Sequence, residues 1–283
     1  MATPCKLRLL YHDGDKNDFV TAKFACSWIR RSRQTCLWLA WRVCVAGLFS
    51  LSLFLSIFMS GDWLADGRSR ATWLIYLTNW SFAVLTLSQI MRAVDVWLSD
   101  LNILQSRGSN LLPWTYKVTW IVHEVAMNAA LNSTFLYWAS GLGSTSKMDE
   151  LDVFTHGIHA FIISFHLIIS ATPVRCVHVF FSLIYYMMYG AFTFVYQYCG
   201  GLNAKGEPLI YPFLDWEEKP IDATLMMITV LSFAFVFQAF FVFLCYIRDK
   251  LHDKICPRPE FERGPAIIGL RDVINTYIAP EIK

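Results

Sequence analysis

Three histidines lie close together in an otherwise apolar stretch, FTHGIHAFIISFH. At about 100° per residue, His156, His159 and His166 fall within about 40° of one line along a helix. Asp152 and Ser170 share that line, so the pattern predicts one polar stripe along a membrane-spanning helix. Ionisable side chains inside such a helix mark functional sites by default, and hydrogen bonding between helices is the alternative interpretation for each histidine.

A hydroxyl is predicted at the same depth as one of these imidazoles. Thr78 is six residues past Thr72, and His159 is seven residues past Asp152, where two apolar runs begin. At ~1.5 Å per residue, both side chains are predicted roughly 10 Å below the outer boundary of the membrane. If the two helices are neighbours, the pair is typical of a nucleophile and its general base. His166 is predicted two turns deeper, as a structural or pathway residue.

Polar side chains also share a face on three other apolar runs. In chain order these are Thr78, Gln89 and Arg92; Lys117, Glu124 and Asn128; and His178, Ser182, Tyr185, Tyr189 and Tyr196. Four polar stripes in one small bundle indicate a buried polar cavity. Glu124 is predicted to form a structural ion pair with Arg92 or Lys117.

The composition is that of a membrane protein. Of 283 residues, 55% are hydrophobic and 16% are charged, and the mean hydropathy is +0.41. Soluble domains usually carry about 25% charged residues. A net charge of +2 argues against nucleic-acid binding. The sequence contains no Gly-rich phosphate loop and no HExxH or GxSxG pattern.

Six apolar runs approach or exceed the roughly 20 residues that a helix needs to span a bilayer. They are Leu37–Met59, Thr72–Leu98, Pro113–Ala139, Asp152–Thr172, Val174–Gln197 and Ile221–Ile247. They predict an all-α, polytopic membrane helix bundle of six transmembrane helices over residues 37–247. Residues 1–36 and 248–283 are predicted as tails, and the first run is expected to act as an uncleaved signal-anchor.

The distribution of Lys and Arg predicts the orientation. Sixteen of these residues lie in the two tails and in the links on the same side, and five lie in the opposite links. Because cytoplasmic segments carry the excess of positive charge, both termini are predicted to be cytosolic. The endoplasmic reticulum and the plasma membrane both fit this topology.

Three short motifs resemble those of a known family. FTHGIHAFIISFHLII resembles the H-G-x-H helix of the rolling stone family and of the related androgen-induced membrane hydrolases. YLTNWSF (Tyr76–Phe82) resembles that group's threonine motif, and LIYPFLDW (Leu209–Trp216) resembles its Tyr-Pro-Phe-Leu segment. Order, spacing and the six-span layout match from Leu37 to Ile247. The length, the basic tails and the Trp-rich early region favour the rolling stone branch.

The resemblance implies two different functions. The androgen-induced members hydrolyse fatty acid esters of hydroxy fatty acids, which implies Thr78 as nucleophile, His159 as catalytic histidine and an acyl ester among membrane lipids as substrate. In that mechanism His156 supports His159, and Asn79 or Asn128 is the candidate oxyanion donor. Rolling stone members are associated with myoblast fusion instead. The expected enzyme uses no cofactor and no metal, and the oligomeric state is unspecified.

Two other classes of protein remain as alternatives. A non-enzymatic fusion or adhesion factor would need a recognition surface, for which the link Cys199–Pro220, with its aromatic and acidic IYPFLDWEE, is the candidate. A haem or metal protein would need histidines on paired helices. The run with Thr78 has none, whereas His123 and His178 lie on separate runs.

Overall fold

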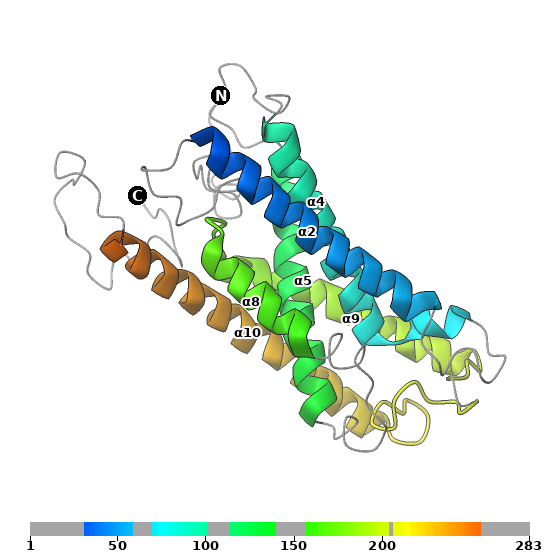
Figure 1. Ribbon diagram of the computed structural model, residues 1–283. Helices are drawn as coiled ribbons and strands as arrows, with labels where there is room; N and C mark the ends of the chain where they lie inside the picture. The colour runs from blue at the N-terminus through cyan, green and yellow to red at the C-terminus, as the bar shows by residue number, and fades with distance from the viewer. Residues whose placement is uncertain (1–30, 59–69, 101–113, 140–156, 204–205, 256–283) are drawn as a thin grey trace, which may run out of the picture.

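The computed structural model describes residues 31–58, 70–100, 114–139, 157–203 and 206–255. Within these ranges the chain is all-α, as the sequence predicts, with six α-helices and two 3-10 segments (Figure 1). The helices are α2 (Arg31–Phe58), α4 (Leu77–Asp100), α5 (Trp114–Ala139), α8 (His159–Ile169), α9 (Val179–Tyr198) and α10 (Pro220–Ile255). The 3-10 segments are η2 (Arg70–Ile75) and η4 (Cys176–His178).

Four helical segments are long and apolar enough to cross a membrane, by length and composition. They are Cys36–Phe58, Leu77–Ser99, Cys176–Tyr198 and Pro220–His252. α8 is shorter, since its 11 residues extend about 16 Å across a hydrocarbon core of about 30 Å. The four long helices indicate an integral membrane protein, while the full count of six spans stays a prediction.

Helix α5 lies at the centre of the bundle. It packs against α4, α8, α9 and α10, while α2 covers α4 from the other side and α8 lies along α10 (Figure 1). Ala126, Ala129 and Ala130 are buried on α5, and such small side chains let neighbouring helices approach closely. One apolar cluster joins Phe82 and Met127 to α2, α8 and α10, so the core runs through the whole bundle.

The predicted fourth run continues to Thr172, but α8 ends at Ile169. Ser170 has extended backbone angles, φ −90° and ψ 152°, and Pro173 disfavours a helical conformation of the residue before it. Nη1 of Arg248 donates to the carbonyl oxygens of Ser170 and Thr172 at 2.9 and 2.8 Å. These bonds satisfy backbone acceptors that the early end of the helix leaves exposed.

Helix α9 ends in a Schellman motif. The N–H of Gly201 donates to the carbonyl of Tyr196, and that of Gly200 to the carbonyl of Gln197, both at 2.9 Å. Gly200 has φ +75°, in the left-handed region that glycine enters without steric cost. A Cβ on Gly201 would overlap the ring of Tyr196. The turn directs the chain into the link that precedes α10.

That link is held in place by one carboxylate. Oδ1 of Asp215 accepts hydrogen bonds from the backbone N–H of Glu218 at 3.0 Å, from Nε2 of Gln197 at 2.9 Å and from the backbone N–H of Glu217 at 3.1 Å. The N–H of Glu218, followed by the Gln197 amide, lowers the pKa of this carboxyl below its usual value. Asp215 therefore fastens the link to the last turns of α9.

Candidate functional site

Thr78 lies in the first turn of α4, at one end of the bundle. The preceding residues form η2, so α4 begins at Leu77 and Thr78 is its second residue. The neighbouring Asn79 anchors this turn, because its Nδ2 donates to the carbonyl oxygen of Trp73 at 2.7 Å. The side chains of Thr78 and Asn79 are half-buried, so the Thr78 hydroxyl is held at the rim of the bundle.

Tyr211 of the link reaches the same turn. Its hydroxyl oxygen accepts a hydrogen bond from the backbone N–H of Leu77 at 3.1 Å and interacts with the hydroxyls of Thr78 and Tyr189. Tyr189 in turn donates to the carbonyl oxygen of Ile75 at 2.7 Å. Burial raises the pKa of Tyr211 to about 12, so its hydroxyl stays protonated at neutral pH and can both donate and accept.

His159, the first residue of α8, lies at the level of the next turn of α4 after the turn that carries Thr78. Its ring centroid is 6.1 Å from that of Phe82, which is four residues past Thr78 and therefore on the same face of α4. His159 is 1% exposed. No hydrogen bond joins Thr78 to His159 among the described residues. The equal depth predicted from the sequence assumed that α4 begins at Thr72, whereas residues 70–75 form η2.

Of the predicted supporting residues, Asn79 lies beside Thr78 and Asn128 lies elsewhere. Nδ2 of Asn128 donates to the carbonyl oxygen of Ala234 at 2.8 Å, and its Oδ1 accepts from the Tyr186 hydroxyl at 3.1 Å. These bonds place Asn128 between α5, α9 and α10, away from the first turn of α4. His156 lies outside the described residues.

The structure pairs Glu124 with a residue other than Arg92 or Lys117, the partners that the sequence predicts. Oε1 of Glu124 lies 2.7 Å from Nδ1 of His178, whereas Arg92 donates from Nη2 to the hydroxyl of Thr172 at 2.7 Å. Lys117 precedes Glu124 by two helical turns, about 10 Å along α5. Glu124 faces η4 and α10, and no ion pair joins it to Arg92 among the described residues.

Glu124 is the centre of a buried network that joins α5 to α10 and to η4. Its Oε2 accepts from Nε2 of Gln238 at 2.7 Å, and its Oε1 accepts from the backbone N–H of Arg175 at 3.3 Å. Gln238 also donates to the carbonyl oxygen of Arg175 at 2.7 Å. Sequence reasoning missed Gln238, although a lone amide in an otherwise apolar spanning helix is itself a signal for a buried hydrogen-bond partner.

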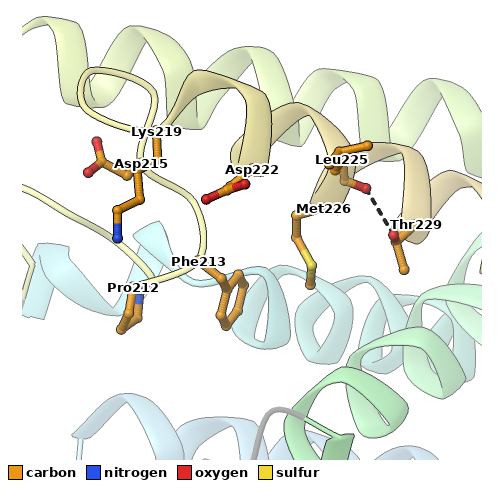
Figure 2. Close-up of a pocket in the computed structure, with 8 residues that line it drawn as sticks. All are labelled: Pro212, Phe213, Asp215, Lys219, Asp222, Leu225, Met226 and Thr229. Carbon is orange, nitrogen blue, oxygen red and sulfur yellow. Dashed lines mark hydrogen bonds between the residues drawn. The ribbon is translucent and has the colours of Figure 1, made fainter.

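A shallow pocket lies between the link and α10. It has a volume of about 300 Å³ and is formed by the link and the first turns of α10. Figure 2 shows Phe213 of the link facing Met226 of α10, with Asp215, Lys219 and Asp222 at the rim. Neither Thr78 nor His159 lines this pocket, so it is distinct from the first turn of α4.

The predicted recognition segment IYPFLDWEE is folded against the bundle over part of its length. Ile210, Leu214 and Asp215 are buried, and the Tyr211 hydroxyl is bonded to the backbone of Leu77. Much of the segment therefore contacts the protein itself. As for metals, no group of three or more His, Cys, Asp or Glu side chains with metal-binding geometry occurs in the described ranges.

Comparisons with known proteins agree with the family that the three motifs resemble. A family model described as protein rolling stone matches residues 17–256. The protein named rolling stone in Drosophila melanogaster is 27% identical over 161 residues, which cover 53% of this chain and 57% of that protein. The match thus spans little more than half of the relative's length. No solved structure matches the chain.

Proposed function

The chain belongs to the rolling stone family, and we propose that it hydrolyses ester bonds of membrane lipids, with Thr78 as the nucleophile and His159 as the general base. The convergence of the three motifs supports this proposal. Tyr211 of LIYPFLDW contacts the first turn of YLTNWSF, and Phe82 at the end of YLTNWSF contacts His159 of FTHGIH. Two segments that are each more than 70 residues from YLTNWSF in sequence thereby contact the turns of α4 on either side of Thr78.

In the proposed reaction, the Thr78 oxygen attacks the ester carbonyl carbon of a lipid while His159 accepts the hydroxyl proton, directly or through one water. The C–O bond to the leaving alcohol breaks, and His159 returns the proton to that alcohol. A water molecule then attacks the acyl-threonine, giving a free fatty acid and restoring the hydroxyl. Catalytic hydrogen bonds are often loose without substrate, so the one-turn offset between the two residues is compatible with this role.

Two neighbours of Thr78 have supporting roles in the proposal. One amide hydrogen of Asn79 is taken by the carbonyl of Trp73, and the second is available to a developing oxyanion. Tyr211 stays protonated and orients the Thr78 hydroxyl. His156 is proposed to set the tautomer of His159, and Asn128 belongs to the network around Glu124 rather than to this site.

The proposal is tested by labelling the full-length protein in membranes with a lipophilic fluorophosphonate. Thr78→Ala and His159→Ala should abolish labelling, and Tyr211→Phe should slow it by on the order of tenfold, because one oriented hydrogen bond is lost. Tyr198→Phe is the matched control, since Tyr198 is 79% exposed. Labelling at the wild-type rate in Thr78→Ala or His159→Ala would refute the hydrolase proposal.

A role in cell fusion is the second candidate, from the family resemblance. Thr78→Ala separates the two functions, since fusion activity that survives this substitution does not depend on the hydroxyl.

We also propose that all six predicted apolar runs, the fourth extending beyond α8 at both ends, cross the membrane of the endoplasmic reticulum or the plasma membrane, with both termini cytosolic. The charge asymmetry of the links supports this orientation. Epitope tags at the two ends, stained before and after selective permeabilisation of the plasma membrane, check the sidedness.

A further inference from the structure

A second buried polar cluster lies at the opposite end of the bundle from Thr78. It contains two arginines, Arg42 of α2 and Arg92 of α4, which are 1% and 4% exposed. Arg92 is 14 residues past Thr78 on the same helix, a distance of about 21 Å along the axis. By the positive-inside distribution this is the cytosolic end. The cluster takes no part in the proposed ester chemistry.

The two arginines lie close to each other and to an imidazole. The guanidinium of Arg42 stacks 4.4 Å above the ring of Trp38, and that ring meets His166 edge to face at 5.8 Å. Arg42 and Arg92 interact through their charges, and both act on His166. Gln89 precedes Arg92 by three residues, so it lies on the same face of α4.

Most hydrogen-bond donors in this cluster have no partner among the described residues. The atoms without one are Nε and Nη1 of Arg42, Nε and Nη1 of Arg92, Nε1 of Trp38, Nε2 of Gln89, Oγ of Ser170 and both ring nitrogens of His166. Every one of these side chains is less than a tenth exposed. Buried donors are normally paired, and charged ones more strictly than neutral ones. Such a concentration of donors without a partner in the described ranges points to a bound acceptor.

The charge of Asp95 acts on both arginines, but this carboxylate does not serve as their hydrogen-bond acceptor. Asp95 follows Arg92 by three residues on α4 and is buried, and its carboxylate is bonded to Thr119. No carboxylate lies within ion-pair distance of Arg42 or Arg92 in the described ranges. The third arginine, Arg248, donates to backbone carbonyls and pairs with Asp249 at 3.0 Å, so it adds positive charge nearby without supplying an acceptor.

The position of Arg92 is fixed independently of any ligand. Its Nη2 donates to the hydroxyl of Thr172, and the carbonyl of the same residue accepts from Arg248. The extended segment after α8 therefore holds one edge of the Arg92 guanidinium and leaves Nε and Nη1 free. On Arg42, the aromatic face of Trp38 holds the guanidinium plane. Both guanidinium groups are thus oriented before any ligand binds.

We propose that Arg42 and Arg92, with Trp38, Gln89 and His166, form a buried binding site for a phosphate group. A guanidinium fork suits carboxylate and phosphate alike, but a carboxylate has only about four acceptor positions. The unpaired N–H-bearing atoms of Arg42, Arg92, Trp38 and Gln89 already exceed that number. A phosphate, with three or four oxygens, can satisfy them all.

The phosphate can belong to a lipid headgroup or be inorganic. Neighbouring positions on α2 present apolar side chains outward, with Leu37 61% and Val43 56% exposed. Acyl chains of a phospholipid could pack on that face of α2 while the headgroup enters the cluster. Both sources share the same chemistry, and the experiment distinguishes them.

The test uses the full-length protein purified in a neutral detergent, with binding measured by calorimetry and by thermal unfolding. The probes are inorganic phosphate, a short-chain phosphatidic acid and the matching diacylglycerol, which lacks only the phosphate. If phosphatidic acid binds and inorganic phosphate does not, the site holds a lipid headgroup. If both bind, the site holds a free phosphate group. Arg42→Gln and Arg92→Gln should each weaken binding by on the order of ten- to a hundredfold.

Two further variants keep the test decisive. Lys250→Gln removes a cation from an exposed position in the last turns of α10. This variant should bind like the wild type. If the arginine variants do not fold, Trp38→Phe keeps an aromatic ring beneath Arg42 and removes the Nε1–H, so binding should weaken several-fold. The proposal is overturned if no probe binds, if diacylglycerol binds as tightly as phosphatidic acid, or if the variants in the cluster bind like Lys250→Gln.

Discussion

Nδ1 of His178 lies 2.7 Å from Oε1 of Glu124, and both side chains are at most 1% exposed. The same carboxylate accepts from Gln238 and from the backbone of Arg175, so one residue of α5 ties together η4, α10 and the segment before η4. The central position of α5 in the bundle makes this network a structural hub.

Removing the carboxylate should destabilise the bundle strongly. Glu124→Ala leaves His178 and the Gln238 amide buried without their acceptor, and should lower the free energy of unfolding by about 3–5 kcal/mol. Glu124→Gln keeps the shape and one acceptor, and should cost about 1–3 kcal/mol. Unfolding in mixed micelles, followed by circular dichroism, measures both. Glu217→Gln, at an exposed position, is the control, and equal stability of Glu124→Ala and this control would contradict the prediction.

The two alanine substitutions at Gly200 and Gly47 should have opposite effects. Gly200 has φ +75°, so Gly200→Ala forces a side chain into the left-handed region and should cost about 1–2 kcal/mol. Gly47 lies inside α2, and a Cβ there meets nothing within 4 Å. Gly47→Ala should therefore stabilise by about 0.5–1 kcal/mol. Melting temperatures of the two variants test this, and a shift of the same sign in both would contradict it.

The stability of the link should depend on pH through Asp215. Its three hydrogen bonds lower the pKa of the carboxyl in the folded protein, so the stabilisation is fully present above the unfolded value of about 3.9. It is lost as the pH falls through the lower folded pKa. The melting temperature of Asp215→Asn should therefore lie below that of the wild type at neutral pH, with a difference that shrinks in acid. A difference that is constant between about pH 7 and about pH 3 would argue against this linkage.

The amino-acid pattern predicted the faces of the helices better than their ends. His159, His166 and Ser170 were assigned to one polar face, and all three are buried. The periodicity sets such faces, because 3.6 residues per turn place these positions in one row. The start of α4 was not predicted, because the apolar composition of residues 72–76 does not distinguish the last part of η2 from a first turn of α-helix.

The partners of the candidate site residues were the least predictable part. The Thr78 motif was identified, but Tyr211, 134 residues from Leu77 along the chain, was assigned to a recognition surface. Glu124 is predicted to pair with Arg92 of α4 or Lys117 of its own helix, whereas its partner His178 lies in η4. In both cases several helices offered a suitable polar side chain, and the sequence held no information on which of them faced the residue.

The sequence by itself determined an all-helical membrane bundle, the polar faces of four of its apolar runs and the family motifs, since composition and period depend on local residues alone. Only the tertiary structure decided that Tyr211 closes over Thr78, that His178 pairs with Glu124 and that the donors of Arg42 and Arg92 share one buried cluster. These pairings depend on where each helix begins and how it is rotated against its neighbours. Packing of the whole bundle sets those two quantities.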